Sequence, residues 1–355
     1  MNDNTKTLAM AFFGAANGYN GFKSYFDEIF DSKKFTRIFV IKGGPGTGKS
    51  TFMKRVSRHF SNKGDDVEEI YCSSDPSSLD GVIIRRANNK IAFLDGTAPH
   101  EMDAKIPGAI YEIINLGDNF DTAKLIKHRE KIISLSDKKS AYYKNAYGYL
   151  KSAGVAFEFS KAKYEKYFDE PTIEKYASYI LSSTTQDEDF EDTTRLISSF
   201  SKHGYKTLDT LDQLSDRRID IPCDRMCTEL FLTRLHSAAK KNKISHVAFP
   251  SPFSLELTEA VYFIKSRLVV TKCHSDTPSN DFILHKYRDT LKDETEAAIK
   301  IEEIAKEEAI KWFNEASKAH FELEKIYFEA VNFEKNDEIL EKKIKETQYL
   351  LSFDK

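Results

Sequence analysis

A run of glycines followed by lysine and serine carries the most specific chemistry in this sequence. Gly43, Gly48, Lys49 and Ser50 match the pattern G-x-x-x-x-G-K-[ST] in full. Glycines let backbone N–H groups turn inward around a phosphate without Cβ clashes. The lysine of this pattern reaches the β- and γ-phosphates, and the hydroxyl binds Mg²⁺. We therefore expect a site for ATP or GTP with Mg²⁺, formed by Gly43, Gly44, Pro45, Gly46, Thr47, Gly48, Lys49, Ser50 and Thr51.

The segments on both sides of this loop are those that a phosphate loop requires. Residues 37–42, RIFVIK, are β-branched and aromatic, which predicts a strand. After the loop, Phe52, Met53, Val56 and Phe60 recur at helical spacing. The N-terminus of that helix would bring a partial positive charge toward the phosphate. The sequence thus favours a strand–loop–helix phosphate site over a chance glycine-rich turn.

Two aspartates follow predicted strands beyond the loop. Asp95 closes the apolar run at residues 91–94 and resembles a Walker B aspartate, which holds magnesium, usually through water. Ser50 and Asp95 are therefore the predicted metal residues. Asp75 lies just past a strand that ends at Cys72. It would contact metal-bound water or a substrate hydroxyl, or instead cap a turn.

The sequence leaves the general base open. Hydrolytic P-loop enzymes often carry glutamate directly after the Walker B aspartate, whereas Gly96 stands there in this chain. The nearest candidates are His100 and Glu101, and His100 also fits a plain loop histidine. The attacking group is then water activated from elsewhere or an acceptor other than water. The predicted catalytic residues are Lys49, Asp75, Asp95 and Glu101.

Composition and charge exclude several classes of protein. The chain has 355 residues, 40% of them hydrophobic and 31% charged, which suits about two globular domains with long solvated helices. Its net charge of −3 provides no global attraction to nucleic acid or to an anionic membrane. No apolar run reaches the roughly 18 residues of a spanning helix. The apolar stretch LAMAFFGAA lacks the basic flank of a signal peptide.

The four cysteines are too few for a disulfide framework and indicate reduced thiols. Cys223, Cys227, Cys273 and His274 form a poor zinc set, because adjacent Cys273 and His274 are awkward ligands of one tetrahedral ion. We therefore expect a cytoplasmic protein whose partner is a nucleoside triphosphate, with no membrane contact and no indication of nucleic acid. The sequence identifies neither a protein partner nor a small-molecule acceptor.

The second half of the sequence resembles a worn copy of the first. A shift of 179 positions aligns two apolar helix faces, Phe52, Met53, Val56 and Phe60 with Phe231, Leu232, Leu235 and Ala239. Upstream, GFKSYFDEI from Gly21 resembles GYKTLDTL from Gly204. The phosphate chemistry is lost, because Gly43, Gly48, Lys49 and Ser50 fall on Pro222, Cys227, Thr228 and Glu229. Lys272 takes the place of Asp95. We therefore expect one nucleotide per chain.

Each half is followed by a charged segment that predicts helices, at about residues 121–181 and from about residue 285 onward. The tyrosines of the first segment would stack on a nucleobase or pack as ordinary ring contacts. The polar stretch at 182–194 predicts a linker. The predicted division is 1–122 as a P-loop nucleotide-binding domain, 123–190 as helical appendage and linker, 191–282 as a degenerate P-loop-like α/β repeat, and 283–355 as a C-terminal helical region.

Several longer motifs accompany the loop: FFGAANGYNGF, YCSSDPSSLDGV, LDGTAPHE and PGAIYEIINLGD. With GGPGTGKST, they resemble a family of bacterial P-loop proteins with two tandem P-loop halves and helical appendages, across nearly the whole chain. The resemblance implies an ATP- or GTP-binding P-loop fold and an ATPase activity, without a physiological substrate. In that family the second half commonly carries its own P-loop, from which this sequence departs. The first motif would fold over the nucleobase through Asn17 or Asn20, or cap a sheet.

The expected fold is therefore α/β, a P-loop NTPase parallel sheet duplicated in tandem, with a degenerate second copy and long helical segments. The leading expectation for function is a Mg²⁺-dependent ATPase that couples nucleotide state to conformation. A small-molecule or nucleoside kinase, with Asp75 or Glu101 near the acceptor hydroxyl, is the alternative. A nucleotide-gated adaptor with little turnover is the third.

Overall fold

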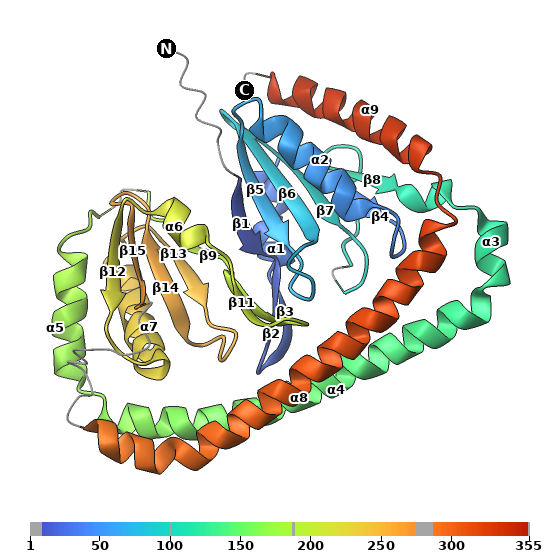
Figure 1. Ribbon diagram of the computed structural model, residues 1–355. Coiled ribbons are helices and arrows are strands. Elements are labelled where there is room, and N and C mark those ends of the chain that lie inside the picture. The colour runs from blue at the N-terminus through green and yellow to red at the C-terminus, as the bar shows by residue number, and fades with distance from the viewer. Residues whose placement is uncertain (1–8, 100, 187–188, 274–286, 354–355) are drawn as a thin grey trace.

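Two mixed β-sheets, joined by long helices, form the two halves of the chain (Figure 1). The computed structural model describes residues 9–99, 101–186, 189–273 and 287–353. We call residues 9–120 the first half and residues 189–273 the second half. The α/β class expected from the sequence is confirmed.

The first sheet has six strands in the order β1-β5-β6-β7-β4-β8. They are β1 (Met10–Phe13), β4 (Arg37–Lys42), β5 (Asp66–Tyr71), β6 (Leu79–Arg86), β7 (Asn89–Asp95) and β8 (Tyr111–Asn115). The expected all-parallel sheet is wrong at β6, which runs antiparallel to both β5 and β7. Arg86 pairs with Asn89 across a two-residue turn, and Ala87 in that turn has a φ of 49°. So short a turn can join only antiparallel strands.

The second sheet has five strands in the order β12-β15-β14-β13-β9. They are β9 (Asp192–Thr194), β12 (Arg217–Ile221), β13 (His246–Pro250), β14 (Thr258–Phe263) and β15 (Leu268–Lys272). From β12 to β9 the pairings are parallel, antiparallel, antiparallel and parallel, the same succession as from β4 to β1. The predicted linker at 182–194 is therefore partly strand, because Asp192–Thr194 pairs in parallel with β13.

A β-hairpin and a short helix belong to each half. They are β2 (Ala15–Gly18), β3 (Gly21–Ser24) and α1 (Phe26–Ile29) in the first, and β10 (Ser198–Ser201), β11 (Gly204–Thr207) and α6 (Thr210–Leu214) in the second. The halves meet beside the hairpins, where Phe13 N–H donates to the Leu196 carbonyl at 2.8 Å. Asn17 is fully buried there and donates to the Phe200 carbonyl at 2.8 Å. Its side chain therefore joins the halves, while Asn20 is exposed.

The helices lie against the sheets and along one side of the molecule (Figure 1). Their bounds are α2 (Lys49–Ser61), α3 (Thr122–Lys127), α4 (Arg129–Tyr167), α5 (Glu170–Leu181), α7 (Arg225–Lys241), α8 (Arg288–Phe328) and α9 (Phe333–Leu351), with short 3₁₀ helices η1 (Ser32–Lys34) and η2 (Leu116–Asn119). The two predicted charged helical segments are thus confirmed over the described residues. Among those residues no helix is both long and apolar enough to cross a membrane.

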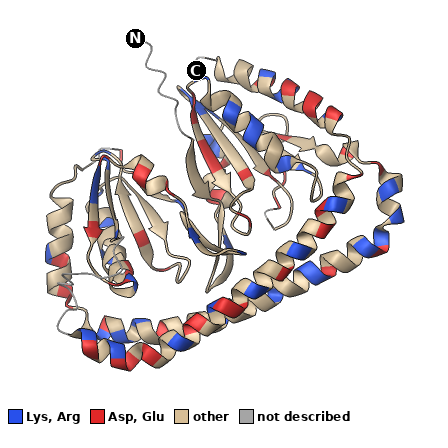
Figure 2. Ribbon diagram, viewed as in Figure 1, with Lys and Arg blue, Asp and Glu red and all other residues tan. Residues whose placement is uncertain are grey.

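Helices α4 and α8 form a long antiparallel pair that reaches from one half to the other (Figure 1). Figure 2 shows both signs of charge interspersed along these two helices. Lys318 pairs with Glu315 at 2.6 Å and Lys325 with Glu322 at 2.7 Å, three residues apart on α8. Such pairs support an exposed helix face, as the alternating charges predict.

The strands of the two sheets divide their apolar side chains between opposite faces. On β4, Phe39 and Ile41 pack with α2 and α9, whereas Ile38 and Val40 belong to a cluster that includes Phe249 of the second sheet. A buried ion pair crosses the same junction, with Arg195 Nε 2.9 Å from the Glu68 carboxylate. Each fully buried large side chain contributes about 1.5–3 kcal/mol. The two halves therefore share one apolar core where they meet.

Candidate nucleotide site

The glycine-rich loop, Gly43–Gly48, joins the end of β4 to the start of α2. The predicted strand and helix on its two sides are confirmed. Gly46 and Gly48 have φ values of 69° and 84°, a left-handed backbone that favours glycine. Gly48 caps the helix in this conformation, so that Lys49 begins the first turn. The loop therefore presents its backbone at a helix N-terminus, where anions are stabilised.

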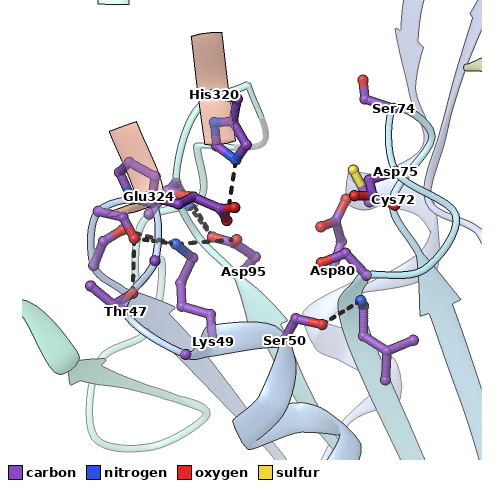
Figure 3. A pocket seen from close by; sticks show the side chains of 18 of the residues that line it. Thr47, Lys49, Ser50, Cys72, Ser74, Asp75, Asp80, Asp95, His320 and Glu324 are labelled. Atoms are coloured by element: carbon purple, nitrogen blue, oxygen red, sulfur yellow. Dashed lines mark hydrogen bonds and ion pairs between the residues drawn. The ribbon is translucent and has the colours of Figure 1, made fainter. Parts of the chain in front are cut away.

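Lys49 lies between the loop and Asp95 (Figure 3). Its ammonium donates to the carbonyls of Gly43 at 3.0 Å and Gly44 at 2.9 Å, and lies 3.7 Å from Asp95 Oδ2. Parallel pairing of β4 with β7, which aligns Ile41 with Asp95, brings these two groups together. Burial raises the pKa of Asp95, an effect that the Lys49 charge partly offsets.

Backbone and side-chain donors fix the Asp95 carboxylate. Thr97 donates to Asp95 Oδ1 from its N–H at 2.8 Å and from its hydroxyl at 2.6 Å. The other oxygen, Oδ2, is thereby turned toward Lys49. The predicted Walker B-like aspartate thus stands at the end of β7, beside the lysine of the loop.

Ser50 faces the turn between β5 and β6, and its hydroxyl accepts from Leu79 N–H at 2.9 Å. The next residue, Asp80, is buried with 7% of its surface exposed. Figure 3 shows Asp80 between Ser50 and the Cys72–Asp75 turn. Asp80 is not among the residues predicted from the sequence, since no strand is predicted at residues 79–86. A lone aspartate opening the apolar run LDGVII was the available signal.

Asp75 lines the cavity beside the loop but is already paired. Its Oδ2 lies 2.8 Å from Lys202 Nζ, which belongs to the second half, and its Oδ1 accepts from Ser77 N–H at 3.1 Å. Burial would raise the pKa of Asp75, but the hydrogen bonds from Lys202 and Ser77 outweigh that effect and lower it. Asp75 is thus a turn residue that also lines the cavity, and its contact with metal-bound water or a substrate hydroxyl stays a prediction.

The remaining predicted residues divide between cavity and surface. Gly44, Pro45, Thr47 and Thr51 line the cavity with the rest of the loop, and the Thr47 hydroxyl donates to the Gly44 carbonyl at 2.8 Å. Glu101 is exposed and does not occur among the residues that line the cavity. His100 lies outside the described residues.

Helices α8 and α9 pack directly on the glycine-rich loop. A Cβ atom at Gly46 would lie 2.6 Å from the carbonyl oxygen of Glu324, and one at Gly44 would lie 3.0 Å from the Tyr327 ring. Asn336 of α9 donates to the Thr47 carbonyl at 3.1 Å. The glycines therefore serve two purposes, because they free the loop backbone and also admit a helix against it.

Charged side chains from α4 and α8 complete the site, and sequence analysis missed them. His320 Nε2 lies 3.5 Å from Glu324 Oε1, and this contact lowers the pKa of Glu324. Figure 3 places both residues on the same side as Lys49 and Asp95. Lys139 of α4 also lines the cavity, and burial together with the Lys49 charge lowers its pKa. In the sequence these residues belong to charged helices and are typical of a solvated face.

The cavity has a volume of about 1520 Å³. Ligand pockets usually measure about 300–1,000 Å³, so this one exceeds the space that a single small ligand needs. Aromatic side chains line part of the wall, among them Tyr143, Tyr147 and Phe321. The hydroxyl of Tyr147 donates to Asn17 at 2.8 Å, so this tyrosine also serves the junction of the halves. A polyphosphate at the loop would leave room for an aromatic-walled base and for a second molecule.

The corresponding place in the second half is built differently. Only residues 222–224 separate β12 from α7, and the Asp224 side chain caps the helix by accepting from Cys227 N–H at 2.9 Å. Cys227, aligned with the helix cap Gly48, therefore lies within α7 and not before it, whereas Thr228 is a helix residue like Lys49, with which it is aligned. Glu229 is buried, and burial raises its pKa to about 7, although the nearby Arg225 charge opposes the rise.

The sheet register preserves the remaining correspondence. Lys272 pairs with Ile221 at the end of β12, as Asp95 pairs with Ile41 at the end of β4. A cation thus occupies the place of the predicted metal ligand. The four cysteines, all of them within the described residues, form no disulfide with one another.

The oxygen donors around the loop fit a magnesium ion. Ser50 offers a hydroxyl, while Asp95 and Asp80 offer carboxylates, and hard oxygen ligands are those that Mg²⁺ prefers. The arrangement can hold a polyphosphate between backbone N–H groups, Lys49 and such an ion. No family model, curated protein or solved structure matches the chain.

Proposed function

We propose that this chain is a Mg²⁺-dependent ATPase of the P-loop type, in which nucleotide state is coupled to conformation. The observation that carries the proposal is the position of Lys49, which lies on a complete glycine-rich loop and 3.7 Å from Asp95 at the end of the adjacent strand. Strand, loop, helix and facing aspartate are the parts that bind nucleoside triphosphates in such proteins. These groups would bind the triphosphate of ATP and that of GTP alike.

The residues have distinct roles in this proposal. The loop backbone and Lys49 bind the β- and γ-phosphates, and Ser50 and Asp95 hold the magnesium ion, Asp95 through water. Asp80, across from Ser50, is a further oxygen ligand on the side of the turn. The bound ion would neutralise charge on the phosphates. Lys139 adds a second ammonium to the wall near Lys49, where it would attract the same anion.

Helix α8 supports the coupling of nucleotide state to conformation. Near its C-terminal end, Glu324 and Tyr327 touch the glycine-rich loop. Farther back, Asn314 donates to the Lys202 carbonyl at 2.8 Å, and Phe313 packs in the core of the second half. The charge of a phosphate bound at the loop would interact with the His320–Glu324 pair on α8. The bound nucleotide would thereby influence a helix that contacts both halves.

The base that would activate water stays a prediction. Asp75 is a weak candidate, because a carboxylate with a lowered pKa accepts a proton poorly at neutral pH. Glu101 is exposed and would have to move to reach the cavity. Glu324 lies closer to Lys49, although its pairing with His320 also lowers its pKa. We therefore expect slow turnover unless a second molecule completes the site.

Phosphoryl transfer to a small molecule is the second candidate, favoured by the volume of the cavity. About 1520 Å³ exceeds the usual range of about 300–1,000 Å³ for one ligand. Asp75 and Asp80 lie on the wall opposite Lys49, where an acceptor hydroxyl would approach. This alternative requires the same loop chemistry and differs only in the attacking group.

We also infer that the two halves arose by tandem duplication of a P-loop unit and that the second copy has lost its phosphate site. The shared succession of strand pairings supports this, as do the hairpin and short helix in each half. The bridge between Phe13 and Leu196 joins residues that the GFKSYFDEI–GYKTLDTL alignment makes equivalent. Such a contact is expected where two copies meet about a twofold axis. The family of tandem P-loop proteins that the sequence resembles has this organisation.

The proposal is tested by titration calorimetry with Mg²⁺–ATP, followed by measurement of phosphate release. We expect one bound ATP per chain, and release that depends on Mg²⁺ and weakens in Asp95→Asn. A control is Asp216→Asn, an exposed aspartate of the second half far from the loop. Phosphorylated products, detected by mass spectrometry with a pool of metabolites, would favour phosphoryl transfer. Binding without turnover would favour an adaptor, and absence of ATP binding would contradict the proposal.

A further inference from the structure

Three side chains converge at the edge of the second sheet, far from the glycine-rich loop in the fold. Asp192 lies on β9, His246 on β13 and His236 on α7. The parallel register of β9 and β13 pairs Asp192 with His246 directly. One ligand atom from each residue lies within 4.8 Å of the others.

The hydrogen bonds of this cluster leave its inner atoms facing one another. The Nδ1 of His246 lies 2.7 Å from the Ile244 carbonyl, which can only accept, so Nδ1 carries the proton. The Nε2 of a neutral His246 is then an acceptor, fully buried and without a hydrogen-bond partner. The Nε2 of His236 is likewise buried and without one. If the Nδ1 of His236 also carries its proton, two nitrogen lone pairs and a carboxylate converge on one point, and a cation bound among them would stabilise the arrangement.

The two distances from the Asp192 carboxylate to the histidine nitrogens are those of a tetrahedral metal site. Asp192 Oδ1 lies 3.4 Å from His246 Nε2 and 3.5 Å from His236 Nε2. Ligands about 2.0–2.1 Å from a tetrahedral zinc ion are about 3.3–3.4 Å apart. A single proton would bridge only two of the three atoms.

The surroundings also resemble those of a metal centre. Metal-binding histidines usually donate their other N–H to a carbonyl, as His246 does to Ile244. Lys240 lies 2.8 Å from Asp192 Oδ2 and holds the carboxylate so that Oδ1 faces the histidines. Asp192 and His236 are each partly exposed, which leaves a side open for water as a fourth ligand.

We propose that Asp192, His236 and His246 bind a divalent transition-metal ion, with zinc as the best match, which ties β9 and α7 to β13. Two imidazoles and a carboxylate suit this class of ion better than Mg²⁺ or Ca²⁺, which prefer oxygen ligands. The site is distinct from the nucleotide site and is confined to the second half. The same shift of 179 positions puts Ser57 and Val67 at the places of His236 and His246, so the first half lacks it.

The test is zinc binding by the full chain after removal of metals with a chelator. Titration with zinc chloride, read by elemental mass spectrometry after dialysis, should give one ion per chain and a higher Tm. His236→Gln and Asp192→Asn should each weaken binding by more than about 100-fold, since losing even a hydrogen-bond partner of a ligand typically costs about 10- to 100-fold. The exposed His128→Gln, matched in chemistry, should bind as the wild type does.

Cobalt identifies the ligands independently of the variants. The Co²⁺ form should show the visible absorption of a four-coordinate ion without a thiolate charge-transfer band. That band would assign the metal to cysteines and overturn the proposal. Absence of stoichiometric zinc, or zinc retained by a correctly folded His236→Gln, would overturn it as well. Circular dichroism of each variant, taken without metal, separates loss of the site from loss of the fold.

Discussion

The loop before α2 and the loop before α7 are the clearest contrast in the molecule. Residues 43–48 separate β4 from α2, whereas residues 222–224 separate β12 from α7. The first loop contains four glycines and ends in Gly48, and the second begins with Pro222 and ends in the helix cap Asp224. The strand and the helix are therefore joined by a long, glycine-rich loop in the first half and by a short loop without glycine in the second.

The two halves share apolar residues at aligned positions and differ at the polar and charged ones. Phe52 and Phe231 both pack against their sheets, as the aligned helix faces predict. Around them, Ser50 corresponds to the buried Glu229, Asp80 to Glu259, and Asp95 to Lys272. Packing requires only shape and apolar surface, so it can be alike in two units whose charged residues differ. A substitution in the second half can therefore serve as a control for a substitution at the aligned position of the first.

The largest effect on stability is expected at the aligned, buried phenylalanine rings of α2 and α7. Phe231→Ala and Phe52→Ala should each lower the free energy of unfolding by about 3–5 kcal/mol, because both remove a buried ring. Urea denaturation followed by circular dichroism measures the loss. Phe159→Ala, at an exposed position of α4, should cost far less. A loss below about 1 kcal/mol at Phe231 alone would break the equivalence of the two helices.

ATP affinity should depend on the loop lysine of the first half and not on the aligned residue of the second. Lys49→Ala removes a charge-assisted contact of about 2–3 kcal/mol and should weaken ATP binding by tens-fold or more. Thr228→Ala, the aligned position of the second half, should leave affinity unchanged, because Thr228 is buried within α7. Titration calorimetry reports both affinity and stoichiometry. Two nucleotides per chain, or tight binding that survives in Lys49→Ala, would show that the second half still binds phosphate.

The dependence of stability on pH should reveal the charge of Glu229, which the alignment places opposite Ser50. Burial raises the pKa of Glu229 from an ordinary value of 4.5 to about 7. The folded chain then keeps this proton to higher pH than the unfolded chain does. The free energy of unfolding should therefore fall as the pH rises from about 4.5 to about 7, by roughly 1–3 kcal/mol.

Glu229→Gln should reduce that fall and stabilise the chain at pH 8 relative to the wild type, while the part caused by Glu259, whose pKa burial raises to about 8, remains. Urea denaturation at pH 5 and pH 8 measures it. Glu256→Gln, an exposed glutamate of the same half, is the control. An unchanged dependence in Glu229→Gln would mean that other groups cause the fall.

The smallest effect concerns Lys202, a cation of the second half that pairs with Asp75 in the wall of the cavity. Lys202→Ala removes the ion pair with Asp75, which is partly exposed, so the loss of stability should be at most about 1 kcal/mol. The pKa of Asp75 should rise toward its ordinary value when this partner is removed. If Asp75 is the base, phosphate release should then become faster near neutral pH, and Asp75→Asn should abolish it. Unchanged release in both variants would exclude Asp75 from that role.

Local patterns predicted the parts of the site that lie close together in sequence. The strand at 37–42, the helix after Gly48 and the position of Asp95 all follow from residue types within short windows. The antiparallel course of β6 was missed because a two-residue turn without glycine gives a weak signal. Asp224 offered a helix cap that would have shown α7 beginning early.

The groups contributed by distant helices could not be predicted in this way. His320 and Glu324 reach the loop only because α8 crosses it, and nothing in an alternating Glu–Lys pattern records which turn of a long helix does so. The same is true of Lys202, which approaches Asp75 through the junction of the halves. Their positions depend on contacts between segments more than a hundred residues apart.

Helix α8 has 41 residues, and at 1.5 Å per residue an α-helix of that length extends about 60 Å. One end packs closely against the glycine-rich loop because Gly44 and Gly46 have no side chains that would keep it away. Paired along its length with α4, the helix resists bending and behaves as a rod. A rod pivoted near one end acts as a lever, so a tilt of a few degrees at the loop becomes a displacement of several ångströms at the far end. The close packing at Gly44 and Gly46 would then also set the point about which α8 tilts.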